Sequence, residues 1–174
     1  MTTAKKTQIG KSKSDPFRIE IRNKFIAVTE VMNNRNQWWV VSIRDAKDKS
    51  APVDEFKEMC LGILPLYFDD VHRPSEQADF IFPRIEQVRQ AVEWSRGKDA
   101  ILVHCHAGIS RSSAIAYVIA CDKIGPKEAI KVLDSRLHWP NPLVIALGAE
   151  VLGNPEVVNT FIHWKAHMRT QGLV

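Results

Sequence analysis

The order of hydrophobic and polar residues indicates short strands in the first half of the chain and helices in the second. Residues 17–21 alternate between apolar and charged side chains, which is typical of a half-buried strand. Residues 38–43 and 100–103 are continuous apolar runs, as expected for strands that are covered on both faces. Further strands are predicted at 25–28 and 61–68. Together these segments supply up to five strands for one sheet.

Helical spacing marks the rest of the chain. Apolar residues recur at i, i+4, i+7 and i+11 from Ile81 to Val92, which predicts an amphipathic helix that ends at 97–99. A second helix is expected to begin after Ser112 and to stop at Gly125, so that Pro126 opens a third. The apolar side of that third helix would carry Ala129, Ile130, Val132, Leu133 and Leu137. Two more helices are predicted at 142–153 and from residue 155, with loops at 44–52 and 71–75.

The order of the elements and the size of the chain predict a single α/β domain. Its core would be a central, mostly parallel sheet of four to five strands that is flanked by helices. The chain has 174 residues, of which 45% are hydrophobic and 25% charged, and this is an ordinary globular composition. We expect residues 17–174 to form the domain and residues 1–16 to be a flexible basic tail that Pro16 closes.

The excess positive charge is concentrated in this tail. Residues 1–14 contain four lysines and no acid, and the formal net charge of the whole chain is +4. The rest of the chain is therefore neutral, which argues against a nucleic acid as partner. No apolar run reaches the roughly 18 residues that a membrane span needs. Three cysteines are an odd number and too few for a disulfide framework, so we expect a cytoplasmic protein.

The segment from Val103 to Ser113 carries the candidate chemistry. It follows a predicted buried strand and opens a predicted helix, which is where α/β sheets bind phosphate. Gly108 allows the backbone to curl so that successive N–H groups point inward, and Arg111 offers a planar fork for two phosphate oxygens. The candidate phosphate-binding residues are His106, Ala107, Gly108, Ile109, Ser110 and Arg111.

Cys105 stands at the centre of this positive field and is the candidate nucleophile. Beside an arginine and a helix N-terminus, it is expected to be a thiolate at neutral pH. A thiolate can attack phosphorus directly and form a phosphocysteine intermediate, which divides one difficult step into two. Ser112 is expected to donate a hydrogen bond to the sulfur and to ease its departure in the second step.

A metal site at His104, Cys105 and His106 is the competing interpretation of the same segment. Adjacent residues on a strand point to opposite faces, so the three side chains cannot easily share one ion. The chain also lacks a Cys-x-x-Cys pair that would complete a zinc site. We therefore predict no metal and no cofactor. His104 is expected to orient the loop by hydrogen bonding, and His106 to lie near the mouth of the pocket.

The run His-Cys-x-Ala-Gly-x-Ser-Arg-Ser at 104–112 resembles the phosphate-binding loop, or P-loop, of the dual-specificity branch of cysteine-dependent protein phosphatases. The similarity extends over about residues 25–165. It includes 40–43, 64–70, 113–117 and 127–129, and the Arg…Pro-Asn stretch at 136–141. The resemblance implies a three-layer sandwich and a shallow pocket that accepts phosphotyrosine.

The resemblance also implies a general acid, an aspartate on a loop after the strand that ends near Phe68. This aspartate protonates the leaving oxygen and then activates water as a base. Asp69 and Asp70 both stand at this point. If Leu64, Leu66 and Phe68 face the core, the period of two places Asp70 on the same face. Asp70 is therefore the predicted acid, and Asp69 is the alternative.

The predicted function is hydrolysis of phosphate monoesters on a phosphorylated protein, with phosphotyrosine first and phosphoserine or phosphothreonine second. Related loops that act on phosphoinositides tend to carry lysines where His106 and Ile109 stand here. The alternatives are a phosphatase of a phosphoinositide or an RNA 5′ end, and a phosphate-binding module without turnover. Such a module would typically lose the nucleophile or the arginine. Five tryptophans are candidates for the pocket rim, although each is expected more often in the core: Trp38, Trp39, Trp94, Trp139 and Trp164.

Overall fold

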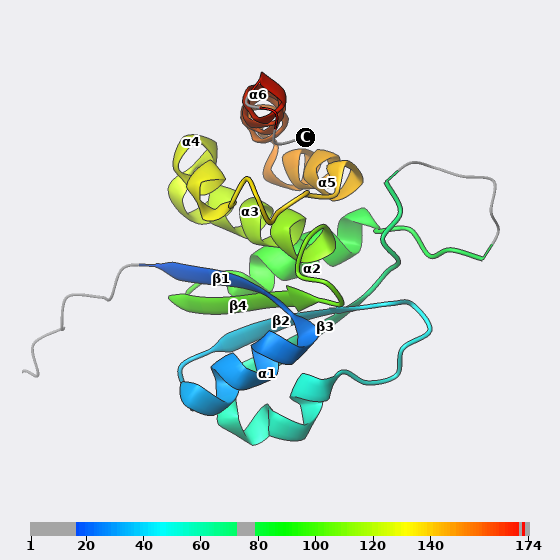
Figure 1. Cartoon of the computed structure of the whole chain (residues 1–174), viewed down its shortest axis with the longest axis vertical. Helices are drawn as coiled ribbons and strands as arrows, with labels where there is room; N and C mark the ends of the chain where they lie inside the picture. Colours follow the sequence, from blue (N-terminus) through cyan, green and yellow to red (C-terminus); the bar gives the residue numbers. More distant parts are fainter. Residues whose placement is uncertain (1–16, 73–78, 171, 173–174) are drawn as a thin grey trace, which may run out of the picture.

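Four parallel strands form one sheet in the part of the chain that the computed structural model describes, residues 17–72, 79–170 and 172. The strand order is β1–β4–β2–β3, and the bounds are β1 Arg18–Asn23, β2 Trp39–Arg44, β3 Gly62–Tyr67 and β4 Ala100–Cys105 (Figure 1). The mostly parallel sheet of four to five strands is thus confirmed. The predicted basic tail, 1–16, and part of the predicted loop at 71–75 lie outside the described residues.

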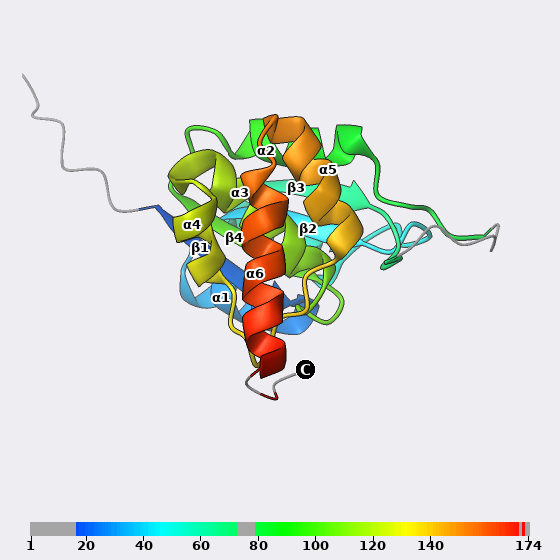
Figure 2. The same ribbon diagram turned by 90° about the horizontal axis from the view of Figure 1, so that it is seen from above.

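Helices cover both faces of this sheet (Figure 1). The helix α1 (Lys24–Asn33) and the 3-10 helix η1 (Pro52–Met59) lie on one face, and α2 (Ile85–Ser95) and α3 (Arg111–Ile124) lie on the other. Outside α3 pack α4 (Pro126–Ala129), the 3-10 turn η2 (Ile130–Val132), α5 (Pro142–Leu152) and α6 (Glu156–Thr170). Seen from above, α6 lies between α4 and α5 (Figure 2). The arrangement is the expected α/β sandwich.

Two hydrophobic clusters fill the space on the two sides of the sheet. Ile101 and Val103 of β4 belong to the larger cluster, together with residues of α2, α3 and α5. Leu102, between them, belongs to the smaller cluster with Ala27 and Val31 of α1. The strand β4 is therefore buried on both faces, as its continuous apolar run predicted. This inner strand of the sheet ends at Cys105.

The prediction of a strand at 25–28 is wrong, because these residues belong to α1. The side chain of Asn23 caps this helix and accepts hydrogen bonds from the backbone N–H groups of Phe25 (3.0 Å) and Ile26 (2.9 Å). Ala27 and Val31, spaced as i and i+4, are the buried residues of α1, whereas Phe25 is 65% exposed. A run of four apolar residues fits either a strand or one side of a helix.

Two helix boundaries also differ from the prediction by more than three residues. The first amphipathic helix begins at Ile85, since Ile81 precedes it and pairs with the backbone of Asp69 instead. The helix that Pro126 opens passes into η2 and ends before Leu133, so Leu137 is an exposed loop residue. The 3-10 helix η1 was not predicted. No helix in the described ranges has the length and apolarity to cross a bilayer.

Candidate active site

The candidate phosphate-binding loop, for which we keep the name P-loop, connects the end of β4 to the start of α3. Gly108 adopts a φ of +76°, and a Cβ atom at this position would lie 2.5 Å from the backbone nitrogen of Asn23. Only glycine tolerates both the left-handed conformation and this close approach to the end of β1. The loop therefore turns tightly against β1, and its curvature depends on this one glycine.

Three carbonyl groups of the P-loop accept hydrogen bonds from backbone N–H groups outside the loop. His106 O accepts a hydrogen bond from Lys24 N–H (3.4 Å), and Ile109 O accepts one from Trp139 N–H (3.0 Å). Ser110 O accepts one from the backbone N–H of Asn141 at 3.2 Å. Because the C=O and N–H of one peptide unit point in opposite directions, the N–H groups of Ala107, Ser110 and Arg111 point away from these partners. Successive N–H groups in a tight loop can bind an anion, and the N-terminus of α3 adds partial positive charge.

Cys105 is the last residue of β4, directly before the turn of this loop, and is only 2% exposed. Its Sγ atom accepts a hydrogen bond from Gly108 N–H at 3.3 Å and lies 3.2 Å from Ser112 Oγ. Both groups can donate a hydrogen bond to the sulfur. The sulfur of Cys105 and the hydroxyl of Ser112 are thus within hydrogen-bond distance of each other.

Arg111, the first residue of α3, is 4% exposed and is held on one side by two acceptors. Its Nη1 donates to the carbonyl oxygen of Phe68 (2.8 Å) and forms an ion pair with Asp45 Oδ1 at 2.6 Å. Its Nε is buried and has no hydrogen-bond partner within the described residues. A buried donor without a partner is unfavourable, and an oxyanion bound in the P-loop would satisfy it.

The two candidate acids point to different places. Asp70 Oδ1 accepts hydrogen bonds from Ser110 Oγ (2.7 Å) and Asn141 Nδ2 (2.9 Å), and lies 3.2 Å from His72 Nε2. Asp69 instead accepts hydrogen bonds from two loop amides, Ala46 N–H at 3.1 Å and Ile81 N–H at 2.8 Å. Asp70 is therefore hydrogen-bonded to the P-loop, whereas Asp69 connects two other loops through hydrogen bonds.

The main pocket is a cavity of about 610 Å³ into which Cys105, Arg111 and Asp70 all open. Its remaining lining comes from Asp45, His72, His106, Ala107, Ile109, Ser110 and Trp139. Gly108 lies on the other side of the loop, against β1. Trp139 is the one tryptophan among the five that lines this pocket, whereas Trp38 is buried in the smaller hydrophobic cluster.

Three further residues contact the predicted site residues from other parts of the chain. Asp45 follows β2, which is the neighbour of β4 in the sheet, so its position at the carboxyl end of a strand was the available signal. Asn141 caps α5 through its Oδ1 and reaches Asp70 through its Nδ2. His72 lies within 3.0 Å of Ser110 Oγ. No local pattern in the sequence connects these distant residues.

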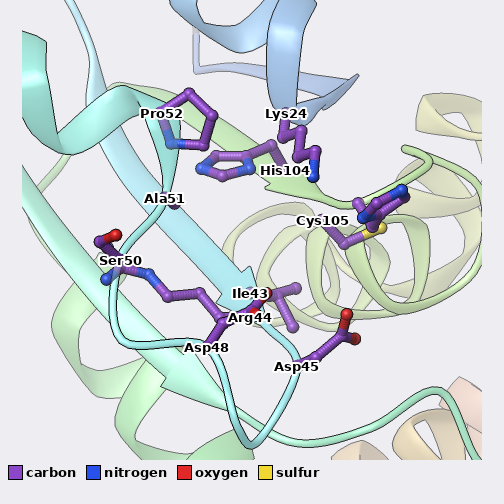
Figure 3. A pocket seen from close by; sticks show the side chains of 11 residues that line it. Lys24, Ile43, Arg44, Asp45, Asp48, Ser50, Ala51, Pro52, His104 and Cys105 are labelled. Atoms are coloured by element: carbon purple, nitrogen blue, oxygen red, sulfur yellow. The ribbon is translucent and has the colours of Figure 1, made fainter.

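A small pocket of about 40 Å³ adjoins Cys105 (Figure 3). The ring of His104 faces it beside Pro52 and Lys24, and Asp45 lies at its other end. Neither ring nitrogen of His104 makes a hydrogen bond of normal geometry with any described residue, so the expectation that His104 orients the loop by hydrogen bonding is wrong. Its burial, at 1% exposure, lowers the pKa of His104 to about 4.

His104 should make the stability of the fold depend on pH. The imidazole is neutral in the folded chain down to about pH 4, whereas the unfolded chain binds the proton from about pH 6.5 downward. The free energy of unfolding should therefore fall by about 3 kcal/mol as the pH drops through this window. Chemical denaturation at a series of pH values measures it. In His104→Gln this contribution to the pH dependence of the free energy of unfolding should disappear. An unchanged pH dependence would contradict the assignment of the effect to His104.

The described residues contain no group of three or more His, Cys, Asp or Glu side chains that could hold a metal ion. A cysteine that ends a central parallel strand, followed by a tight loop and an arginine at the start of a helix, is the arrangement of a cysteine phosphatase. The chain matches the family model of the dual specificity phosphatase catalytic domain over residues 8–144. The chain therefore belongs to this family, and the resemblance seen in the sequence is confirmed.

Solved structures share the fold at low sequence identity. The human tyrosine phosphatase-like serine/threonine/tyrosine-interacting protein is 18% identical, with a TM-score of 0.52 over 72% of this chain and 82% of that one. PTPMT1 in complex with PI(5)P is 15% identical, with a TM-score of 0.52 over 78% and 93%. A point variant of human DUSP28 is 17% identical, with a TM-score of 0.51 over 79% and 94%. No curated protein sequence matches the chain.

Proposed function

We propose that this chain hydrolyses phosphate monoesters on proteins, phosphotyrosine first and phosphoserine or phosphothreonine second. The observation that carries the proposal is that the thiol of Cys105, the guanidinium of Arg111 and the carboxylate of Asp70 open into one pocket. A nucleophile, an anion anchor and an acid are what a two-step phosphoryl transfer needs. The position of Ser112 beside the sulfur supports its predicted role as well.

In the first step the thiolate of Cys105 attacks phosphorus while the bond to the leaving oxygen breaks. Asp70 gives its proton to that oxygen, and Arg111 with the loop amides holds the three remaining phosphoryl oxygens. In the second step Asp70 takes a proton from a water molecule, whose oxygen attacks phosphorus. Cys105 leaves as a thiolate, stabilised by the hydroxyl of Ser112, and inorganic phosphate is released.

A phosphoinositide substrate is the second candidate, because PTPMT1, one of the proteins that share the fold, is seen in complex with PI(5)P. The lining of the main pocket favours a protein. Among the described residues that line this pocket, Arg111 is the one arginine or lysine, and Asp45 already forms an ion pair with it. A headgroup with further phosphates would therefore find little additional positive charge in the pocket. The phosphate-binding module without turnover is the third candidate, and the presence of both Cys105 and Arg111 disfavours it.

A substrate panel tests the proposed function. The full chain should turn over an aryl phosphate and phosphotyrosine peptides, and should act more slowly on phosphoserine peptides and on phosphoinositide vesicles. Released inorganic phosphate is the measurement, and each assay contains a strong chelator because Arg111 and the loop amides supply the charge that metal ions supply elsewhere. Turnover confined to the vesicles, or turnover that needs an added divalent cation, would contradict the proposal.

A further inference from the structure

A second hollow lies directly beside the main pocket. This hollow, here called the side groove, has a volume of about 380 Å³ and is formed by the end of β1, the start of α1, the P-loop and residues 136–138. Ala107 and Ile109 line both the main pocket and the side groove. The two hollows therefore lie on either side of the same segment of the P-loop, and a ligand that extends from one to the other would cross Ile109.

Exposed apolar side chains gather in the side groove. Ile26 is 45% exposed, Ile109 is 45% exposed and Leu137 is 64% exposed. They come from α1, from the P-loop and from the loop before α5, so the folding of three separate segments brings them together. Apolar side chains that converge on one hollow beside a catalytic pocket are typical of an interaction site.

Polar side chains of the side groove already form hydrogen bonds or ion pairs within the chain. Asn23 caps α1 with its side chain, and Arg22 forms ion pairs with Glu20 (2.7 Å) and Glu30 (3.5 Å). His138 Nδ1 accepts a hydrogen bond from the backbone N–H of Asp134 at 2.9 Å, and burial lowers its pKa. The groove therefore offers apolar surface and little unused hydrogen-bonding capacity.

Arg136 is the remaining cation at the rim, with Asp134 Oδ1 3.6 Å from its Nε. Its side chain is 76% exposed, so it stands at the edge of the groove and faces solvent. Water would screen the attraction between Arg136 and a strongly anionic ligand, and the carboxylate of Asp134 would repel that ligand. An uncharged apolar group is the better match for the interior of the groove.

We propose that the side groove holds an apolar side chain of the substrate polypeptide, one to three residues from the phosphorylated residue. This inference rests on the proposed function and deepens it, since it names a class of phosphoprotein sequence. An extended chain advances about 3.3–3.6 Å per residue, so a peptide whose phosphate lies against Cys105 crosses Ile109 within a few residues. When the peptide binds, a leucine, isoleucine or phenylalanine side chain at that position would move from water into the side groove.

Matched phosphotyrosine peptides test the inference. Each pair carries leucine or alanine at one position, from three residues before to three after the phosphotyrosine. Wild type should prefer leucine about tenfold in kcat/KM at one or more positions, which is the discrimination that one apolar contact provides. Leu137→Ser and Ile26→Ser should lose this preference and should keep wild-type turnover of a small aryl phosphate. Ile162→Ser, which removes an exposed apolar side chain from α6, is the matched control and should keep the preference for leucine.

The outcomes separate the side groove from the proposed function. The same peptide preference, measured as binding affinity to the Cys105→Ser variant, does not depend on turnover. Equal rates and equal affinities for every peptide pair, with aryl phosphate turnover intact, would overturn the inference and leave the proposed function standing. Weaker binding of Leu137→Ser to phosphoinositide vesicles, with the peptide preference unchanged, would assign the groove to a membrane and also overturn it. Absence of turnover alone would count against the proposed function.

Discussion

Replacing Cys105 with serine should abolish turnover while phosphate or vanadate still binds. A serine hydroxyl is a far weaker nucleophile than a thiolate, so the rate on any phosphate monoester should fall by about 10³-fold or more. Anion affinity should survive, because the loop amides, Arg111 and the start of α3 do not depend on the sulfur. Initial rates on an aryl phosphate and calorimetric titration with vanadate measure the two effects separately.

Cys60 provides the matched control for this substitution. It is half-buried after η1, donates a long hydrogen bond to Phe56 O at 3.6 Å, and burial raises its pKa to about 11. Its thiol is therefore protonated at neutral pH, and Cys60→Ser should keep full activity. Activity of Cys105→Ser within tenfold of wild type would refute the cysteine mechanism, whereas a large loss in Cys60→Ser would point to a structural effect of removing thiols.

The conformation of the P-loop could be predicted from the sequence because its parts are neighbours in the chain. The turn at Gly108, the sulfur of Cys105 and the fork of Arg111 lie within seven residues, so local stereochemistry limits how they meet. The same holds for Asp69 and Asp70, which a period of two sends in opposite directions after β3. In the structure Asp70 meets Ser110 and Asp69 meets loop amides.

The contacts that fasten the site could not be predicted, because they join segments far apart in the chain. Asp45 pairs with Arg111 from the end of β2, and Asn141 reaches Asp70 from the start of α5. The order β1–β4–β2–β3 creates both neighbourhoods, and nothing local encodes it. The error at 25–28 had a local signal that was missed: Asn23 is a strong N-cap residue directly before the apolar run.

Replacing Asp70 with asparagine should remove the acid and leave its surroundings in place. The amide oxygen of asparagine can still accept the hydrogen bonds that Asp70 Oδ1 accepts from Ser110 and Asn141. The rate toward a phosphotyrosine peptide should fall by about 10²–10⁴-fold, because its leaving oxygen needs a proton. An aryl phosphate with a weakly basic leaving group should lose much less, and the alkaline limb of the pH–rate profile should flatten.

Asp69→Asn is the matched control, one residue away and with the same change of charge. Asp69 accepts backbone N–H groups on both carboxylate oxygens, Ala46 on Oδ1 and Ile81 on Oδ2, and an asparagine would turn its own NH₂ toward one of them. The variant should therefore lose about 1 kcal/mol of stability and show no dependence on the leaving group. If Asp69→Asn shows that dependence and Asp70→Asn does not, the two roles are exchanged. Small effects in both would place the acid elsewhere, with His72 and Asp79 as the next residues to replace.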